Sequence, residues 1–442
     1  MIRENEEKIS KITENVAGKL LDYKNIEKIQ NQKDNQKIIL GDSVKWDRTA
    51  LCSGLPGVCL LLGEMIEKNP KENVWQEIAN EYIGYVVDDI SQNGFDSISL
   101  HNGLSGVGLG VTAIAKRTGG YNKLITNINK AIVSNIQIPI KLTQQKAIIG
   151  YDVIAGLTGI LSYLMLYMED NAVYDAIVEG VQVLIDFTKD WEKDGIKTYG
   201  WLVPPEALFT DEERKTYPEG AFNTGYAHGI AGVLAILSKM IMSGLCLDGQ
   251  KEAINRIMDY YDRYKIFEDN RYIWKGEMGF DEHKAVQNKE PFSGEEFFRR
   301  DAWCYGAPGI SYAMVLAGRV MEDETLVDWA GENLKKAIEK KDAIYSMSMC
   351  HGHAGILQLA KSASVFMKEG YLDENINNLE QCIINSYDVN NPFGFVDKDY
   401  DQSENIIKEY NEIGILNGSS GIVLALQDNG QENRVWKRAF AL

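Results

Sequence analysis

Three side chains of the kinds that bind metals, Cys304, Cys350 and His351, occupy matched positions in neighbouring copies of a repeat. Each cysteine precedes its own Gly-x-x-Gly turn at the same offset. Two thiolates and an imidazole with an open fourth position are typical of a catalytic zinc ion. Two distant cysteines are more often buried small hydrophobes than ligands, so spacing alone is a weak signal. The matched placement favours the metal, and we expect one zinc ion per chain.

An acid/base group is predicted at His228, which directly precedes the Gly-x-x-Gly turn one copy before Cys304. An isolated histidine would more often be a hydrogen-bonded core residue, but this position favours proton transfer. Asp152 and Arg300 carry opposite charges near the same turns, and an Asp–Arg or an Asp–His pair would fix the orientation of the acid/base group. The alternative is a structural salt bridge, and spacing does not choose between Arg299 and Arg300.

The other histidines and cysteines are not expected to take part directly in the chemistry. His101 and His353 also border turns, and His353 is a second-choice ligand. His283 lies in a charged segment and is expected to face solvent. The remaining thiols are interpreted as packing residues: Cys52, Cys59, Cys246 and Cys382.

One pattern, Gly-x-x-Gly followed by an apolar stretch, returns along the chain. The first glycine is expected to permit a turn, and the second to let a helix approach the neighbouring backbone. The copies are Gly54–Gly57, Gly103–Gly106, Gly156–Gly159, Gly229–Gly232, Gly306–Gly309, Gly352–Gly355 and Gly418–Gly421.

Each copy begins a segment with helical period, and a second, more charged helical stretch such as VDWAGENLKKAIEKKD lies between copies. Seven helical hairpins cannot bury their apolar faces alone, so they must stack in series. We predict an all-α fold, an α/α toroid with two concentric rings of seven helices. Closure would bring the turns to one end, where distant residues converge.

We predict a single domain over residues 1–442, interrupted by two insertions at its rim. The longest gaps between copies contain aromatic, β-branched and glycine residues with Pro204 and Pro205. These features predict short strands and loops. We therefore expect small, β-containing, non-helical insertions at 188–225 and 266–300.

Composition excludes some classes of function. The formal net charge of -18 argues against binding to nucleic acid, whose proteins usually carry a basic patch. The N-terminus has no signal-peptide pattern, and six scattered cysteines are typical of a reducing compartment. The apolar runs are too short or too interrupted for a transmembrane segment. We expect a cytoplasmic protein.

The motifs YDVIAGLTGILSYL, GYAHGIAGV, RDAWCYGAPGIS and MCHGHAG resemble those of the lanthipeptide cyclases, the lanthionine synthetase C-like family. The resemblance runs from about Gly54 to Gly421 and is greatest to stand-alone bacterial members that act with a separate dehydratase. It implies an α/α toroid with a small inserted domain. It also implies zinc ligands at Cys304, Cys350 and His351.

The resemblance further implies active-site roles for Asp152, His228, Arg300 and Tyr305, and it selects Arg300 through its place in R-D-A-W-C-Y-G. The implied reaction is an intramolecular Michael addition. A cysteine thiol of a dehydrated precursor peptide adds to dehydroalanine or dehydrobutyrine and forms a thioether ring. The implied partners are that peptide, a lanthipeptide dehydratase and an export transporter, which would place the protein at the membrane peripherally. Whether His228 gives or takes the proton stays open.

Two rival functions remain at this point. A glycosidase or a zinc prenyltransferase-like enzyme could share a toroid, but a glycosidase needs two facing acids, and only Asp152 stands out. A non-catalytic relative could hold a thiol, a peptide or glutathione through zinc without turnover. His228 and Asp152 favour the enzyme.

Overall fold

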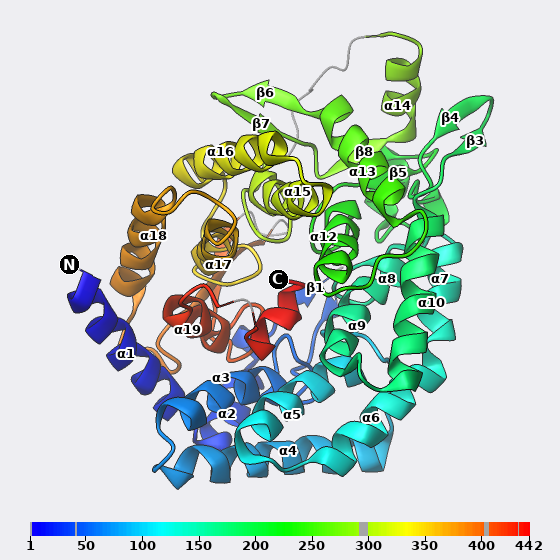
Figure 1. The fold of residues 1–442 in the computed structure, drawn as a ribbon. Helices are drawn as coiled ribbons and strands as arrows, with labels where there is room; N and C mark the ends of the chain where they lie inside the picture. The colour runs from blue at the N-terminus through cyan, green and yellow to red at the C-terminus, as the bar shows by residue number, and fades with distance from the viewer. Residues whose placement is uncertain (1, 40–41, 291–298, 402–405, 432) are drawn as a thin grey trace. The chain divides into compact units, whose positions relative to one another are not determined.

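The computed structural model describes residues 2–39, 42–290, 299–401, 406–431 and 433–442, and most of these residues are helical (Figure 1). This helical content confirms the predicted all-α class. Within the described residues, no helix combines the length and the apolar content needed to cross a bilayer.

A buried helix follows every Gly-x-x-Gly turn, as the repeat predicts. Most first glycines adopt an extended backbone and directly precede the first helical residue. Gly306 differs, because its φ of 93° lies in the region that favours glycine. These helices are α3 (Leu55–Lys68), α5 (Leu104–Thr118), α9 (Leu157–Leu164), α12 (Ile230–Met242), α15 (Ala307–Met321), α17 (His353–Ser364) and α19 (Ser419–Gln427).

A second set of helices lies between the copies and buries only one face. In α4, for example, Trp75, Ala79 and Tyr82 are buried at helical spacing. Several of these helices pack on the buried helix that precedes them, which confirms the helical hairpin. They are α4 (Asn73–Asn93), α6 (Asn122–Asn135), α10 (Asn171–Phe187), α13 (Gln250–Tyr264), α16 (Glu324–Lys340) and α18 (Asp373–Ser386).

The seventh copy takes its helical partner from the other end of the chain. Helix α1 (Ile2–Lys19) packs against α19, and Figure 1 shows it beside α18 as well. The Asn5 amide donates to Asn377 Oδ1 at 3.1 Å, and Lys19 Nζ donates to two carbonyl oxygens, of Val389 at 2.8 Å and Asn391 at 2.9 Å. The first helix therefore completes the last hairpin. This role of α1 was not predicted from the sequence.

The remaining helices are short. They are α2 (Tyr23–Gln30), α7 (Gln137–Gln144), α8 (Ile148–Tyr151), α11 (Asp211–Thr216) and α14 (Phe280–Gln287), with the 3-10 turns η1 (Lys33–Asn35), η2 (Met165–Tyr167), η3 (Pro205–Ala207) and η4 (Val435–Phe440).

The chain forms two compact units. Unit 1 comprises 1–132, 344–364 and 370–439, and unit 2 comprises 133–343, 365–369 and 440–442. Unit 1 thus contains the sixth, seventh, first and second copies, and unit 2 contains the third, fourth and fifth. The single domain over 1–442 stays a prediction.

Backbone hydrogen bonds join the turns of successive copies within unit 2. Val153 N donates to Ala227 O at 2.9 Å, and Tyr226 N donates to Cys304 O at 2.8 Å. These bonds tie the third turn to the fourth and the fourth to the fifth. The residues beside the three turns are therefore neighbours in space.

The same bonds run through unit 1. Cys350 N donates to Leu416 O at 2.9 Å, Leu416 N to Cys52 O at 3.1 Å, and Leu51 N to His101 O at 2.8 Å. The turns follow one another in the order six, seven, one, two. The last copy therefore adjoins the first, as a closed series of hairpins requires.

The second glycine of a turn allows this close approach. A Cβ at Gly106 would lie 2.1 Å from Leu100 O and 2.6 Å from Leu51 Cβ, and one at Gly309 would lie 3.0 Å from Tyr226 Cβ. Leu51 and Tyr226 each belong to the preceding copy. The predicted use of the second glycine is confirmed at these positions.

All described strands are short and pair antiparallel. One pair joins the two insertions, with Asn223 opposite Glu277. The pairs are β1 (Ile38–Ile39) with β2 (Asp42–Ser43), β3 (Trp191–Lys193) with β4 (Ile196–Thr198), β5 (Ala221–Asn223) with β8 (Glu277–Gly279), β6 (Ile266–Glu268) with β7 (Arg271–Ile273), and β9 (Asp397–Asp401) with β10 (Ile406–Tyr410).

The insertions contain the expected strands, but they are not free of helix. The 188–225 segment includes α11, whose first turn is closed by a reciprocal capping box between Thr210 and Glu213. The 266–300 segment includes α14, where the Glu282 carboxylate accepts from Gly279 N at 2.9 Å. Residues 291–298 of this segment lie outside the described residues.

His283 on α14 is buried, so the expectation of a solvent-facing side chain is wrong. Its Nδ1 lies 2.6 Å from the Tyr264 hydroxyl and its Nε2 lies 2.9 Å from Lys197 O. Both ring nitrogens are thus satisfied inside the protein. The prediction was wrong because the charged residues next to His283 in the sequence are partly or fully exposed, whereas His283 itself lies on the inward face of a short helix.

Candidate functional site

Asp152 and His228, from the third and fourth copies, contact one another directly. Asp152 follows α8 and is buried, and its Oδ2 lies 2.5 Å from His228 Nδ1. Its Oδ1 accepts from the backbone N–H groups of Ala155 and Gly156, each at 2.7 Å. The turn of the third copy therefore fixes the carboxylate, and the carboxylate orients the imidazole.

The carboxylate also decides the properties of His228. An ionised carboxylate only accepts hydrogen bonds, so Nδ1 carries the hydrogen and Nε2 is the nitrogen left for chemistry. Burial would lower the pKa of His228, but the hydrogen bond to Asp152 and its charge, with a further contribution from Cys304, raise the pKa above its ordinary value. The side chain is 30% exposed, so a substrate can reach it.

Tyr305 lies next to this pair. Its hydroxyl accepts a hydrogen bond from Asn223 Nδ2 at 2.8 Å, and its ring centroid lies 6.5 Å from that of His228. A Cβ at Gly225 would lie 2.6 Å from Tyr305 Cε1, so a glycine there makes room for the ring. Burial raises the pKa of Tyr305 well above its ordinary value, so the hydroxyl keeps its proton.

Cys304 is 5% exposed, and its carbonyl oxygen accepts from Tyr226 N and Ala227 N. The chain just before it is anchored by a buried ion cluster. Arg271, which is 2% exposed, pairs with Asp301 and with Asp342. This cluster fixes the start of the loop that carries Cys304.

The two candidate arginines differ in their surroundings. Arg299 forms a two-pronged ion pair with Glu268, with N–O distances of 2.5 and 2.7 Å. Arg300 directly precedes the anchored Asp301, and Gly306, whose Cβ would lie 1.9 Å from Arg300 O, passes close to its backbone. Arg299 is thus held in this partly exposed ion pair, and the role of Arg300 stays a prediction.

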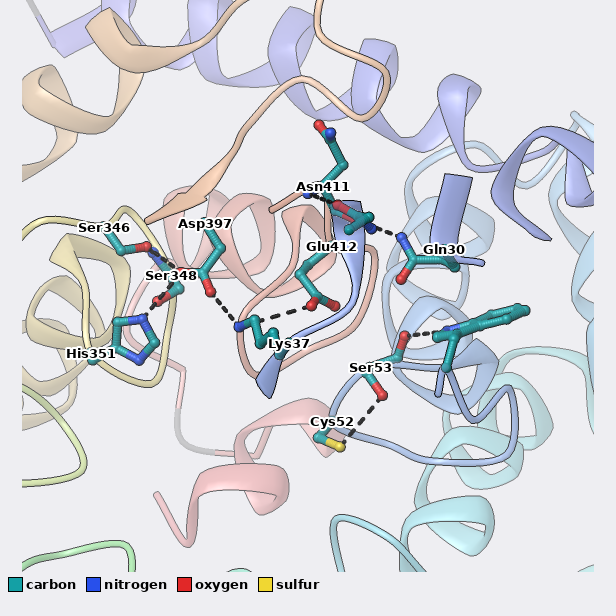
Figure 2. A network of polar contacts seen from close by, with 12 residues as sticks. Gln30, Lys37, Cys52, Ser53, Ser346, Ser348, His351, Asp397, Asn411 and Glu412 are labelled. Atoms are coloured by element: carbon teal, nitrogen blue, oxygen red, sulfur yellow. Dashed lines mark hydrogen bonds and ion pairs between the residues drawn. The ribbon is translucent and has the colours of Figure 1, made fainter. Parts of the chain in front are cut away.

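The other two predicted ligands, Cys350 and His351, belong to unit 1. His351 is 6% exposed, and its Nε2 lies 3.1 Å from Asp397 Oδ1 (Figure 2). Burial would raise the pKa of the Asp397 carboxyl, but the Lys37 ammonium and the His351 hydrogen bond hold it well below its ordinary value. The carboxylate is thus ionised and accepts from the imidazole.

The predicted zinc ligands are divided between the units, with Cys304 in unit 2 and Cys350 and His351 in unit 1. Within the described part of the chain, no three histidine, cysteine or acidic side chains are gathered as a metal site. The donor types nevertheless fit zinc. His351 also has the carboxylate partner that metal-binding histidines usually have on the ring nitrogen that does not bind the metal.

Some residues of these surroundings were not predicted from the sequence. Asn223 holds Tyr305, and Glu277 faces Asn223 across the β5–β8 pair. Burial, and then the charge of Glu213, raise the pKa of Glu277 to about 7, while His228 opposes the shift. Both residues lie in the insertions, outside the Gly-x-x-Gly repeat, so their position relative to a glycine pair could not identify them.

The other histidines that border turns both lie in unit 1. His101 is buried, and its Nε2 lies 2.9 Å from Ala439 O. His353 Nδ1 lies 3.0 Å from Ser346 O.

Cys59 is buried, and burial raises the pKa of its thiol to about 12, which agrees with a packing role. Burial also raises the pKa of the Cys52 thiol to about 11, and its Sγ lies 3.0 Å from Asn102 Oδ1. Cys246 is exposed, so the packing role expected of it is wrong.

The sequence and the structure of this chain are both similar to those of known proteins. Residues 45–441 match the family model described as lanthionine synthetase C-like protein. The chain is 29% identical over 426 residues to the nisin biosynthesis protein NisC of Lactococcus lactis subsp. lactis, covering 95% of each chain. Its structure is similar to that of nisin cyclase, with a TM-score of 0.75 and 26% identity over 89% of this chain and 92% of the other.

Proposed function

Because the chain belongs to the lanthionine synthetase C-like family, we propose that it is a zinc-dependent lanthipeptide cyclase. Its substrate would be a dehydrated precursor peptide with free cysteines. It would act in the cytoplasm, in a complex with a lanthipeptide dehydratase and an export transporter at the membrane. The observation that carries the proposal is the Asp152–His228 pair, an oriented and reachable acid/base group in the same unit as Cys304.

The reaction is an addition without a leaving group. The sulfur of a peptide cysteine forms a bond to the β-carbon of dehydroalanine or dehydrobutyrine. The electron pair of the double bond moves toward the carbonyl, and the α-carbon then takes a proton, so the product is an isomer of the substrate. Zinc held by Cys304, Cys350 and His351 would supply the thiolate, because metal binding deprotonates a thiol.

The residues of the chain divide the remaining work. His228 exchanges a proton through Nε2, either giving it to the α-carbon or taking it from the thiol, and Asp152 holds the ring in place. Arg300 balances the negative charge that develops on the substrate carbonyl. Tyr305 keeps its proton and can donate a hydrogen bond beside the ring of His228.

A direct test uses the alkylation of free thiols. Because ring formation leaves the peptide mass unchanged, purified protein is incubated with the dehydrated precursor, remaining thiols are alkylated, and the peptide is weighed. A cyclase lowers the number of alkylated thiols. A binding protein that holds thiols without turnover leaves all of them alkylatable.

Two variants separate metal binding from proton transfer. Cys304→Ala should lose zinc and cyclisation together, whereas Cys246→Ala, at an exposed position, should lose neither. His228→Asn should keep stoichiometric zinc and lose cyclisation. Normal ring formation by His228→Asn would remove its acid/base role.

A further inference from the structure

Three side chains of unit 1, those of Asp397, Ser346 and Lys37, converge beside His351 (Figure 2). Asp397, the first residue of β9, has a fully buried side chain, and both of its oxygens are used. Oδ1 accepts from His351 Nε2 at 3.1 Å and from Ser346 Oγ at 2.6 Å. Oδ2 accepts from Lys37 Nζ at 2.6 Å.

Lys37 lies in a segment before residue 45, where the match to the family model begins. Its side chain is 16% exposed, and its Nζ also lies 3.8 Å from Glu412 Oε1. Neighbouring bonds hold this segment in place: Asn35 Nδ2 donates to Asn411 O at 2.9 Å, and Asn411 N donates to Asn35 Oδ1 at 2.6 Å. The lysine is therefore placed by the structure around it.

This arrangement dictates how the His351 ring is protonated. Lys37 can only donate, and the Asp397 carboxylate can only accept. Nε2 must therefore carry a hydrogen, and in the neutral ring the lone pair lies on Nδ1. A carboxylate that fixes one ring nitrogen of a histidine commonly sets the tautomer and raises the basicity of the other nitrogen toward a metal.

We propose that Lys37 and Asp397 are a positioning pair that holds His351 with Nε2 protonated and Nδ1 as the metal-binding nitrogen. The metal part of this inference rests on the proposed function, whereas the tautomer does not. Neither residue touches the substrate thiol. Each acts through His351.

The substitution Asp397→Asn tests the pair sharply because the orientation of the new amide is predictable. Lys37 demands an acceptor, so the amide oxygen turns to the lysine and the NH₂ group faces His351. Nε2 must then accept, and the hydrogen moves to Nδ1. Zinc affinity should fall by roughly 10- to 100-fold, which is typical for loss of such a partner.

A second substitution should restore the hydrogen bond to His351 that Asp397→Asn removes. In Asp397→Asn combined with Lys37→Met, nothing holds the amide oxygen away from His351, so the oxygen can accept from Nε2 again. The double variant should therefore bind zinc more tightly than Asp397→Asn alone. Such a rescue is a coupling between neighbours that a purely destabilising substitution would not produce.

The experiment uses the full-length protein and two readouts. Zinc affinity is measured by competition with a chromophoric chelator. The tautomer is read in metal-free protein from the ¹⁵N shifts of the histidine ring nitrogens, with His351→Asn assigning the signal among the five histidines. Lys398→Met is the matched control, because Lys398 pairs with Glu409 at an exposed position of the same hairpin.

We expect Nε2-protonated His351 in the wild type and in the control, and Nδ1-protonated His351 in Asp397→Asn. Unchanged affinity and tautomer in Asp397→Asn would overturn the proposal, as would a double variant that binds zinc no better than the single one. Wild-type protein that binds zinc and shows the expected tautomer but forms no rings would refute the cyclase function alone. Wild-type protein that binds no zinc would overturn the metal part of the inference.

Discussion

The Asp152→Asn variant tests the orientation of His228. The amide has the shape of the carboxylate, and its oxygen must face the two N–H donors of Ala155 and Gly156. The NH₂ group then faces His228 Nδ1, which has to accept. In the neutral ring the hydrogen moves to Nε2, so the nitrogen needed for chemistry is blocked as a base.

The size of the effect follows from the bonds that Asp152 accepts. Hydrogen bonds to a charged group contribute roughly 1.5–3 kcal/mol, against about 0.5–1.5 kcal/mol for neutral ones. Each of the three bonds should thus weaken by roughly 1 kcal/mol, or about 3 kcal/mol of folding stability together. Loss of general acid/base catalysis should slow cyclisation by roughly 10²- to 10⁴-fold.

The stability loss should also depend on pH. The pKa of His228 is raised in the folded protein, so the ion pair with Asp152 stabilises fully below the ordinary pKa of histidine. That contribution is lost as pH rises through the raised pKa. Asp152→Asn should therefore destabilise the protein more at pH 5 than at pH 9.

The assay compares thiol alkylation rates and urea unfolding of the wild type, Asp152→Asn and a matched control. Asp170→Asn is that control, because Asp170 also accepts from two backbone N–H groups, at the start of α10, in unit 2. The control should cyclise at the wild-type rate. A wild-type rate and pH profile in Asp152→Asn would refute the reasoning.

Three further substitutions test the packing and the charges. Gly106→Ala places a Cβ against Leu51 and should lower the free energy of unfolding in urea by about 1–3 kcal/mol or more. Gly84→Ala, with open space around it, should raise that free energy by about 0.5–1 kcal/mol. Equal effects of the two substitutions would contradict the close approach at Gly106. Arg271→Met leaves two carboxylates without their buried cation and should cost about 3–5 kcal/mol, and a loss below about 1 kcal/mol would count against the cluster. Burial raises the pKa of Glu277 to about 7, so the stability from its protonated form is present below pH 4.5 and is lost as pH rises through 7. Relative to the wild type, Glu277→Gln should gain stability between pH 5 and pH 8, by at most about 3 kcal/mol, and parallel pH curves would refute this.

The repeat made much of the fold predictable. Because the same glycine pair marks the start of each buried helix, one local rule locates a whole set of helices. The rule fails where chain order and spatial order differ. Helix α1 lacks a glycine pair, so nothing in its sequence announces that it completes the hairpin of α19.

The contact between Asp152 and His228 was predictable because both residues lie in the turns. Asp152 and His228 were assigned by register, and the backbone bond between Val153 and Ala227 brings their turns together. Asp397 and Lys37 lie outside the register, in a strand and in the segment before β1. Their importance comes from contacts across more than 300 residues, which no local pattern encodes.

The pairing of α1 with α19 has a consequence for how the protein is made. The last residue of α1 is Lys19 and the first of α19 is Ser419, so the ribosome adds 399 residues between them. At roughly 5–20 residues per second, α1 waits about 20–80 s for its partner. During that time α1 can already pack on α3, but the part of its apolar face that packs on α19 has no native cover. Nascent chains should therefore depend on chaperones late in synthesis, and variants that weaken α19 should aggregate in cells before they lose activity in the test tube.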